Sequence, residues 1–89
     1  MGWPLDSLKP LYLAIADELE RRIRAGELPP KSRVPSARAL AAEAGVSTRT
    51  SEAALRVLRE RGLTVSVHGV GTFVSPDVRP ADTPRPDNG

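Results

Sequence analysis

Two short helical segments separated by a single glycine constrain the fold of this chain most strongly. The first is contained in VPSARALAAEA, residues 34–44, where Ser36 is placed to cap a helix with a small apolar face. Gly45 can end that helix in the left-handed conformation, and Ser47 can cap a second helix in STRTSEAALRVLRERG. A turn of about three residues between two helices predicts a helix-turn-helix.

A β-ribbon is expected directly after the second of these helices. Apolar residues occupy every second position from 63 to 67, which predicts a half-buried strand facing the core through Leu63, Val65 and Val67. Residues 72–74 form its expected partner, with Phe73 as the core residue. Residues 68–71 then form the tip of the hairpin, and the whole ribbon has the position of a wing.

A further amphipathic helix precedes this unit. It is expected from Pro10 to a left-handed cap at Gly26, and its apolar stripe consists of Tyr12, Ile15, Ala16, Leu19 and Ile23. Asp17, Glu18, Arg21 and Arg22 fall outside that stripe. Two prolines then favour an extended connection in which Arg33 and Val34 can form a brief strand. The last helix is expected from Thr48 to about Arg61, with Gly62 ending it.

Together these elements predict an α+β fold, mainly α: a winged helix-turn-helix with three helices and a C-terminal β-hairpin wing. The domain is expected over residues 10–75, after a flexible N-terminal arm at 1–9. Residues 76–89 contain four prolines and no periodic apolar face, so they are expected to form a disordered proline-rich tail or linker.

Size and composition exclude several other classes of protein. A chain of 89 residues supports one small domain and leaves little room for a catalytic body or an effector-binding domain. Cysteine is absent, and a single histidine without clustered carboxylates is poor evidence for a metal site. We therefore expect no enzyme activity, no cofactor and no metal. No apolar run approaches the roughly 18 residues that a membrane span needs, so a cytoplasmic location is the default.

Charge is distributed unevenly along the chain, although the net charge is only +2. Residues 31–61 contain seven basic and three acidic side chains, whereas residues 11–27 contain three basic and four acidic ones. The positive potential therefore lies on the predicted helix-turn-helix, which favours a nucleic-acid partner. Arginine-rich helix faces that are merely solvated are the alternative interpretation.

Four segments, in order and with fitting spacing, resemble the DNA-binding domain of GntR-type bacterial transcription regulators: PLYLAIADELERRIRAGELPP, SRVPSARALAAEAGVS, ALRVLRERGL and GVGTFV. The resemblance covers roughly residues 10–75. It implies binding to double-stranded DNA, with repression of transcription as the usual outcome. It further implies a possible homodimer on a palindromic operator. In the family a separate C-terminal domain usually supplies dimerisation and senses a small molecule.

The resemblance also indicates which residues would contact DNA. Arg38 matches an arginine early in the second helix that contacts DNA in the family, and Thr48, Arg49 and Thr50 match contact positions at the start of the third. Arg49 is the best candidate for reading a base, because a guanidinium can bridge guanine O6 and N7. Ser36 and Thr50 either bond phosphates or serve only as caps, and Ser47 matches the cap of the third helix.

The chain departs from the family pattern on its reading face. Many relatives have Arg then Thr where this chain has Thr48 then Arg49, and basic residues common nearby are replaced by Glu52 and Ala53. Glu52 would be repelled by a phosphate but can accept a hydrogen bond from cytosine N4. The ribbon lacks the usual basic residues. Its tip carries His68 and Gly69, which match a pair that contacts the minor groove in some relatives; for His68, placement in an exposed loop is an equal alternative.

These departures leave a second function open. A winged helix whose wing lacks basic residues, and whose reading face carries an acidic residue, can instead be a protein-interaction module with weak or non-specific DNA binding. An enzyme has little support, because no nucleophile, base and orienting group occur together and no glycine loop suits a phosphate.

Overall fold

The computed structural model describes residues 8–78, and in it three helices precede one antiparallel hairpin. The helices are α1 (Leu11–Arg24), α2 (Ala37–Ala44) and α3 (Thr48–Glu60). The strands are β1 (Thr64–Val67) and β2 (Gly71–Val74). The predicted winged helix-turn-helix is therefore confirmed. Most of the expected N-terminal arm and proline-rich tail, residues 1–7 and 79–89, lies outside the described residues.

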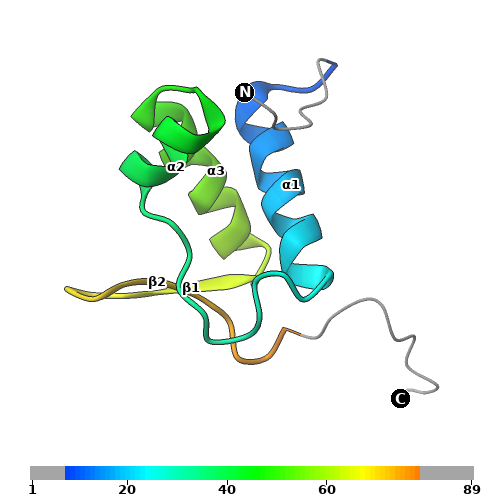
Figure 1. Ribbon diagram of the computed structural model, residues 1–89, viewed down its shortest axis with the longest axis vertical. Coiled ribbons are helices and arrows are strands. Elements are labelled where there is room, and N and C mark those ends of the chain that lie inside the picture. Colours follow the sequence, from blue (N-terminus) through cyan, green and yellow to red (C-terminus); the bar gives the residue numbers. More distant parts are fainter. Residues whose placement is uncertain (1–7, 79–89) are drawn as a thin grey trace.

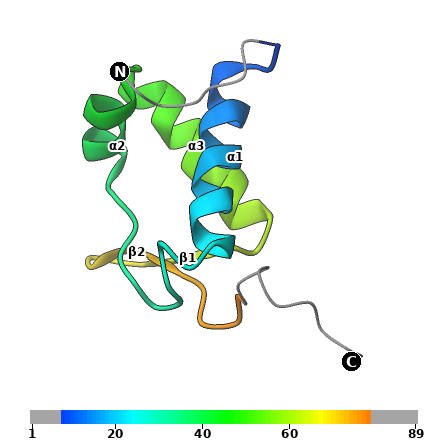
Figure 2. The ribbon, with the colours of Figure 1, turned by 45° about the vertical axis from the view of Figure 1, so that its right-hand side comes forward.

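Helix α3 lies between the other two helices and packs against both (Figures 1 and 2). Its inner side presents Ser51, Ala54 and Leu58, which are buried. The core is completed by side chains of α1, α2, β2 and the connecting segments: Ile15, Ala16, Leu19, Ile23, Val34, Leu40, Leu63 and Val74. One small apolar core thus fixes α2 and α3 relative to α1 and to the base of the ribbon.

The turn between α2 and α3 forms as its residues predict. Gly45 has φ +74° and ψ +36°, and its N–H donates to Ala41 O, so it ends α2 in the left-handed region. The side chain of Val46 is partly buried against the core. Ser47 then begins α3 by accepting a hydrogen bond from the Thr50 N–H at 3.1 Å.

The connection from α1 to α2 pairs with β2 at one isolated bridge, beside the two-stranded wing sheet. The Val34 N–H donates to Thr72 O at 2.8 Å, and the Lys31 N–H donates to Val74 O at 2.9 Å. The Val74 N–H donates in return to Ser32 O, and Arg33 pairs with Phe73 in an antiparallel bridge. In place of the brief strand predicted at Arg33 and Val34 the structure has this isolated bridge, which joins β2 to the segment that leads into α2.

The expected inward face of the ribbon is wrong. Val65 and Val67 are 41% and 45% exposed, whereas Thr64 is buried. Leu63 is buried too, but its N–H donates to Leu58 O, so it belongs to the turn after α3 and does not set the alternation of the strand. The face of Thr64 is the one that meets the helices.

Phe73 is likewise not the core residue of its strand. It pairs with Val65, on the face of the ribbon that points away from the helices, and it is only half-buried. Val74, which pairs with Thr64, fills the core in its place. The ribbon leaves the helices soon after its base and extends into solvent (Figure 1), and its first residue pair, Thr64 with Val74, is the one that is fully buried.

Candidate nucleic-acid interface

The starts of α2 and α3 lie side by side, and most of the candidate residues gather there. The Ser51 hydroxyl, in the first turns of α3, donates to Ala37 O at 2.6 Å and to Thr48 O at 3.0 Å. Ala37 is the first residue of α2. This contact places two groups of candidates next to each other: Ser36 and Arg38 from α2, and Ser47, Thr48, Arg49, Thr50 and Glu52 from α3.

The hydroxyl groups at both helix starts serve as caps. Ser36 Oγ accepts from the Ala39 N–H at 3.1 Å, and Ser47 Oγ accepts from the Thr50 N–H at the same distance. Ser47 also donates to Thr50 Oγ1 at 3.0 Å. Both serines therefore act as N-caps of their helices. The first N–H groups of each helix, and the positive end of its dipole, lie at these capped starts.

Arginines on this surface carry charge that no carboxylate neutralises. Arg38, Arg49 and Arg56 are exposed, and within residues 8–78 none of them forms an ion pair. Arg49 and Arg56 lie two helical turns apart on one side of α3. Glu52 lies between them, exposed and also without an ion pair among the described residues.

The cations of α1 are in the opposite situation. Glu18 accepts from Arg21 and Arg22 at 3.0 and 2.8 Å, and Glu20 accepts from Arg24 at 2.8 Å. Glu18 is buried, contrary to its expected place outside the apolar stripe, because these two arginine side chains satisfy it. The fold therefore neutralises the cations of α1 and leaves those of α2 and α3 available to an anionic partner.

The wing tip carries the remaining two candidates. His68 and Gly69 are exposed at the turn between β1 and β2, far along the ribbon from its base. Gly69 has φ +77°, which glycine adopts without strain. Val70 beside them is 52% exposed. The structure therefore divides the candidates between the starts of two helices and the end of the wing.

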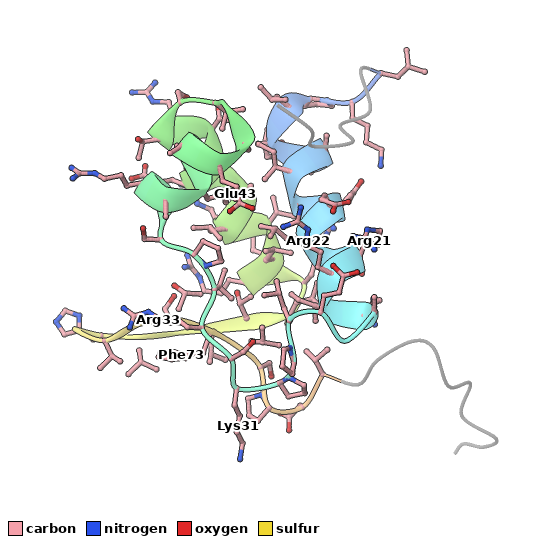
Figure 3. All side chains as sticks on the ribbon, in the orientation of Figure 1. Arg21, Arg22, Lys31, Arg33, Glu43 and Phe73 are labelled. Carbon is pink, nitrogen blue, oxygen red and sulfur yellow. The ribbon has the colours of Figure 1, made fainter. Side chains whose placement is uncertain are left out.

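Sequence reasoning missed Arg33, which lies along the wing (Figure 3). Its Nη2 donates to Val70 O at 2.7 Å, and its Cζ lies 5.9 Å from the centre of the Phe73 ring. The pattern of the ribbon alone could not identify it, because Arg33 reaches the wing from the connection between α1 and α2. The predicted brief strand at Arg33 was the only available signal.

Other kinds of site are not found in the described part of the chain. Residues 8–78 contain no group of three or more His, Cys, Asp or Glu side chains arranged to hold a metal ion. No helix within them is long and apolar enough to cross a membrane.

Comparison with known proteins agrees with the geometry. Residues 11–74 match the family described as bacterial regulatory proteins, gntR family. The mannosyl-D-glycerate transport/metabolism system repressor MngR of Escherichia coli (strain K12) is 46% identical over 66 residues, which are 74% of this chain and 28% of the relative. A histidine utilization repressor of Pseudomonas aeruginosa is 42% identical over 66 residues, 74% of this chain and 26% of the relative. The chain spans about a quarter of the length of these relatives.

Solved structures show the same architecture. The crystal structure of AraR(DBD) in complex with operator ORX1 superposes with a TM-score of 0.72 and 33% identity. The superposition covers 84% of this chain and 92% of that one.

Proposed function

The chain belongs to the GntR family of bacterial regulatory proteins, and from this premise we propose that it reads a specific DNA operator as part of a transcriptional repressor. It is the family's DNA-binding domain. The observation that carries the proposal is the presence of two unneutralised arginines, Arg38 and Arg49, at the adjoining starts of α2 and α3. Repression is supported by the two relatives named above, both of which are repressors.

Each part of this surface has a distinct role in the proposal. Arg49 reads guanine through O6 and N7, and Glu52 accepts from cytosine N4 in the same groove. Arg38 bonds the sugar-phosphate backbone. Thr48, Thr50 and the capping serines Ser36 and Ser47 hold phosphates through hydroxyl or backbone N–H groups. His68 and Gly69 approach the minor groove from the wing.

The operator is expected to be palindromic. A single helix-turn-helix touches only a few base pairs, and such proteins gain affinity by binding as two-fold dimers to half-sites about one helical turn apart. We therefore propose a homodimer on DNA.

Selection of bound sequences from random duplexes tests the proposal. We expect the selection to enrich a palindromic sequence. The logarithm of the protein's affinity for that duplex should fall linearly with log salt concentration. Arg49→Ala should cost about 1 to 3 kcal/mol on the selected duplex and relax the preference at one base pair. Arg38→Ala should weaken binding to all duplexes about equally. It should also lower the slope of log affinity against log salt concentration by about one.

Arg24→Ala is the matched control, because it removes one arginine that is already paired with Glu20 on α1. It should leave the selected sequence and the base preference unchanged. Equal binding of every duplex at low salt, with none at physiological salt, would refute operator recognition.

One observation favours a second candidate, a protein-interaction module. Val65, Val67 and Val70 form an uncharged and exposed part of the wing. Neutral substitution of Arg38 and Arg49 discriminates the two functions. Loss of duplex binding supports operator recognition. Unchanged binding to a protein partner, together with no affinity for DNA, supports the protein-interaction module.

A further inference from the structure

The guanidinium of Arg33 is held against the outer face of the wing. The residue pairs with Phe73, and its side chain runs along β2 toward the tip, where Nη2 donates to Val70 O at 2.7 Å. Its Cζ lies 5.9 Å from the centre of the Phe73 ring, within the range of a cation–π contact. Figure 3 shows Arg33 beside the ribbon, while Lys31 of the same connection points away from it.

Gly71 provides the space that this contact needs. A Cβ at position 71 would lie 3.0 Å from Arg33 Nη2, 3.2 Å from Nε and 3.3 Å from Cζ. Its φ of +145° is also one that residues with a side chain rarely adopt. A side chain at position 71 would therefore crowd the guanidinium, and the planar group lies over β2 where that side chain would project.

The tip of the wing has little else to hold it in place. An isolated two-stranded hairpin is marginally stable in water. Val65, Val67 and Val70 are exposed, and the contact of Arg59 in α3 with the ribbon is made at Ser66, at 3.4 Å, short of the tip. Arg33 connects that tip to the residues just before Ser36, which caps α2. The contact thus links the two separate parts of the candidate interface.

We propose that Arg33 is a positioning residue that fixes the wing tip, residues 68–70, relative to α2 and α3. The inference rests on the proposed DNA binding and adds a residue that acts through the wing. A direct phosphate contact by Arg33 is the competing role. Substitution by lysine distinguishes the two roles. Lysine keeps the charge that a phosphate contact needs, but it has neither the fork of donors nor the planar surface that the positioning role needs.

The first test uses the free protein and needs no DNA. Arg33→Lys and Arg33→Ala should both increase amide hydrogen exchange at Gly69, Val70 and Gly71, with α2 and α3 unchanged. Lys31→Asn is the matched control, because it removes one charge from the same connection and asparagine tolerates the φ of +72° at that position. It should leave the exchange of the tip unchanged. Unchanged exchange in Arg33→Lys would overturn the proposal.

The second test compares two duplexes, the selected operator and a version shortened so that the wing has no DNA to contact. We expect Arg33→Lys and Arg33→Ala each to lose about tenfold in affinity on the long duplex, equivalent to about 1.4 kcal/mol, and to match the wild type on the short one. Loss in Arg33→Ala alone, with Arg33→Lys like the wild type, would show a charge contact and overturn the positioning role. Equal losses on both duplexes would also overturn it.

These results separate the inference from the function on which it rests. If the wild-type protein selects no duplex, the proposed function falls and the inference falls with it. If the wild type binds its operator and both Arg33 variants bind the long duplex as tightly as the wild type does, only the inference is overturned.

Discussion

At the scale of single residues, two buried hydroxyl groups differ in what they contribute. Ser51 is completely buried, and its hydroxyl donates to Ala37 O and Thr48 O. Thr64 is 3% exposed, and Thr64 Oγ1 has no hydrogen-bond partner within residues 8–78. Because an unsatisfied buried polar group costs free energy while a satisfied one stabilises, the two should respond to substitution with opposite signs.

Ser51→Ala should lower the free energy of unfolding by about 1 kcal/mol, since it removes the hydrogen bond that joins α3 to the first residue of α2. Urea denaturation measures the change. Ser66→Ala is the control, because Ser66 is exposed and only accepts from Arg59 at 3.4 Å. A Ser51 variant as stable as the wild type would show that this hydroxyl contributes no stability.

Thr64→Val should raise the free energy of unfolding by about 1 kcal/mol. The substitution keeps the β-branched shape that suits a strand and replaces the unpaired hydroxyl with a methyl group. The same urea titration reports the change. A decrease in stability would mean that the hydroxyl finds a hydrogen-bond partner in solution.

At the scale of elements, the helices could be predicted from sequence because their signals are local. Ser36, Gly45 and Ser47 act within a few residues, and each takes the predicted role. The orientation of the wing could not be predicted in the same way. Leu63 is buried as part of a turn, so the alternation after it suggested the wrong face of the strand.

The candidate site likewise has a part that could be predicted from sequence and a part that could not. The adjoining helix starts were predictable from their caps and from the family resemblance. The role of Arg33 depends on pairing between residues about 40 positions apart, Arg33 with Phe73, for which a short ribbon gives no periodic signal.

Gly45→Ala tests the turn as an element. Nothing lies within 4 Å of a Cβ built there, so the expected cost arises from φ +74° alone, about 1 to 2 kcal/mol. Gly45→Asn should cost less, since asparagine tolerates this conformation. Thermal or urea unfolding ranks the variants, and equal stability of Gly45→Ala and the wild type would contradict the argument.

At the scale of the whole molecule, ion pairs centred on α1 join all three helices. Arg61, just after α3, donates to Asp17 at 2.9 Å and to Glu20 at 2.7 Å. Arg22 donates to Glu18 on its own helix and to Glu43 of α2, toward which it points in Figure 3. The same pairs that hold α1 to its neighbours neutralise its charge, so stability and the location of the free arginines have a common origin.

These carboxylates make the fold sensitive to acid. The hydrogen bond from Arg21, assisted by Arg22, holds the pKa of Glu18 below its ordinary value of 4.5, although burial opposes the shift. Lys9 and then Arg61 hold the pKa of Asp17 below its ordinary value of 3.8. A carboxyl whose pKa is lowered in the folded state stabilises the fold fully above its unfolded pKa. That contribution is lost as the pH falls through the lowered folded value.

Glu18→Gln should therefore be less stable than the wild type at pH 7, and the difference should shrink as the pH falls below about 4.5. The reason is that a protonated Glu18 resembles glutamine in charge, and both then remove this one counter-charge from the two arginines. Urea unfolding at a series of pH values from 7 to 3 measures the difference. Glu52→Gln is the control, because Glu52 is exposed and has no ion pair among the described residues. Its free energy of unfolding should change with pH as that of the wild type does. If the deficit of Glu18→Gln stayed constant across the whole series, the lost stability would come from packing and not from the charge of Glu18.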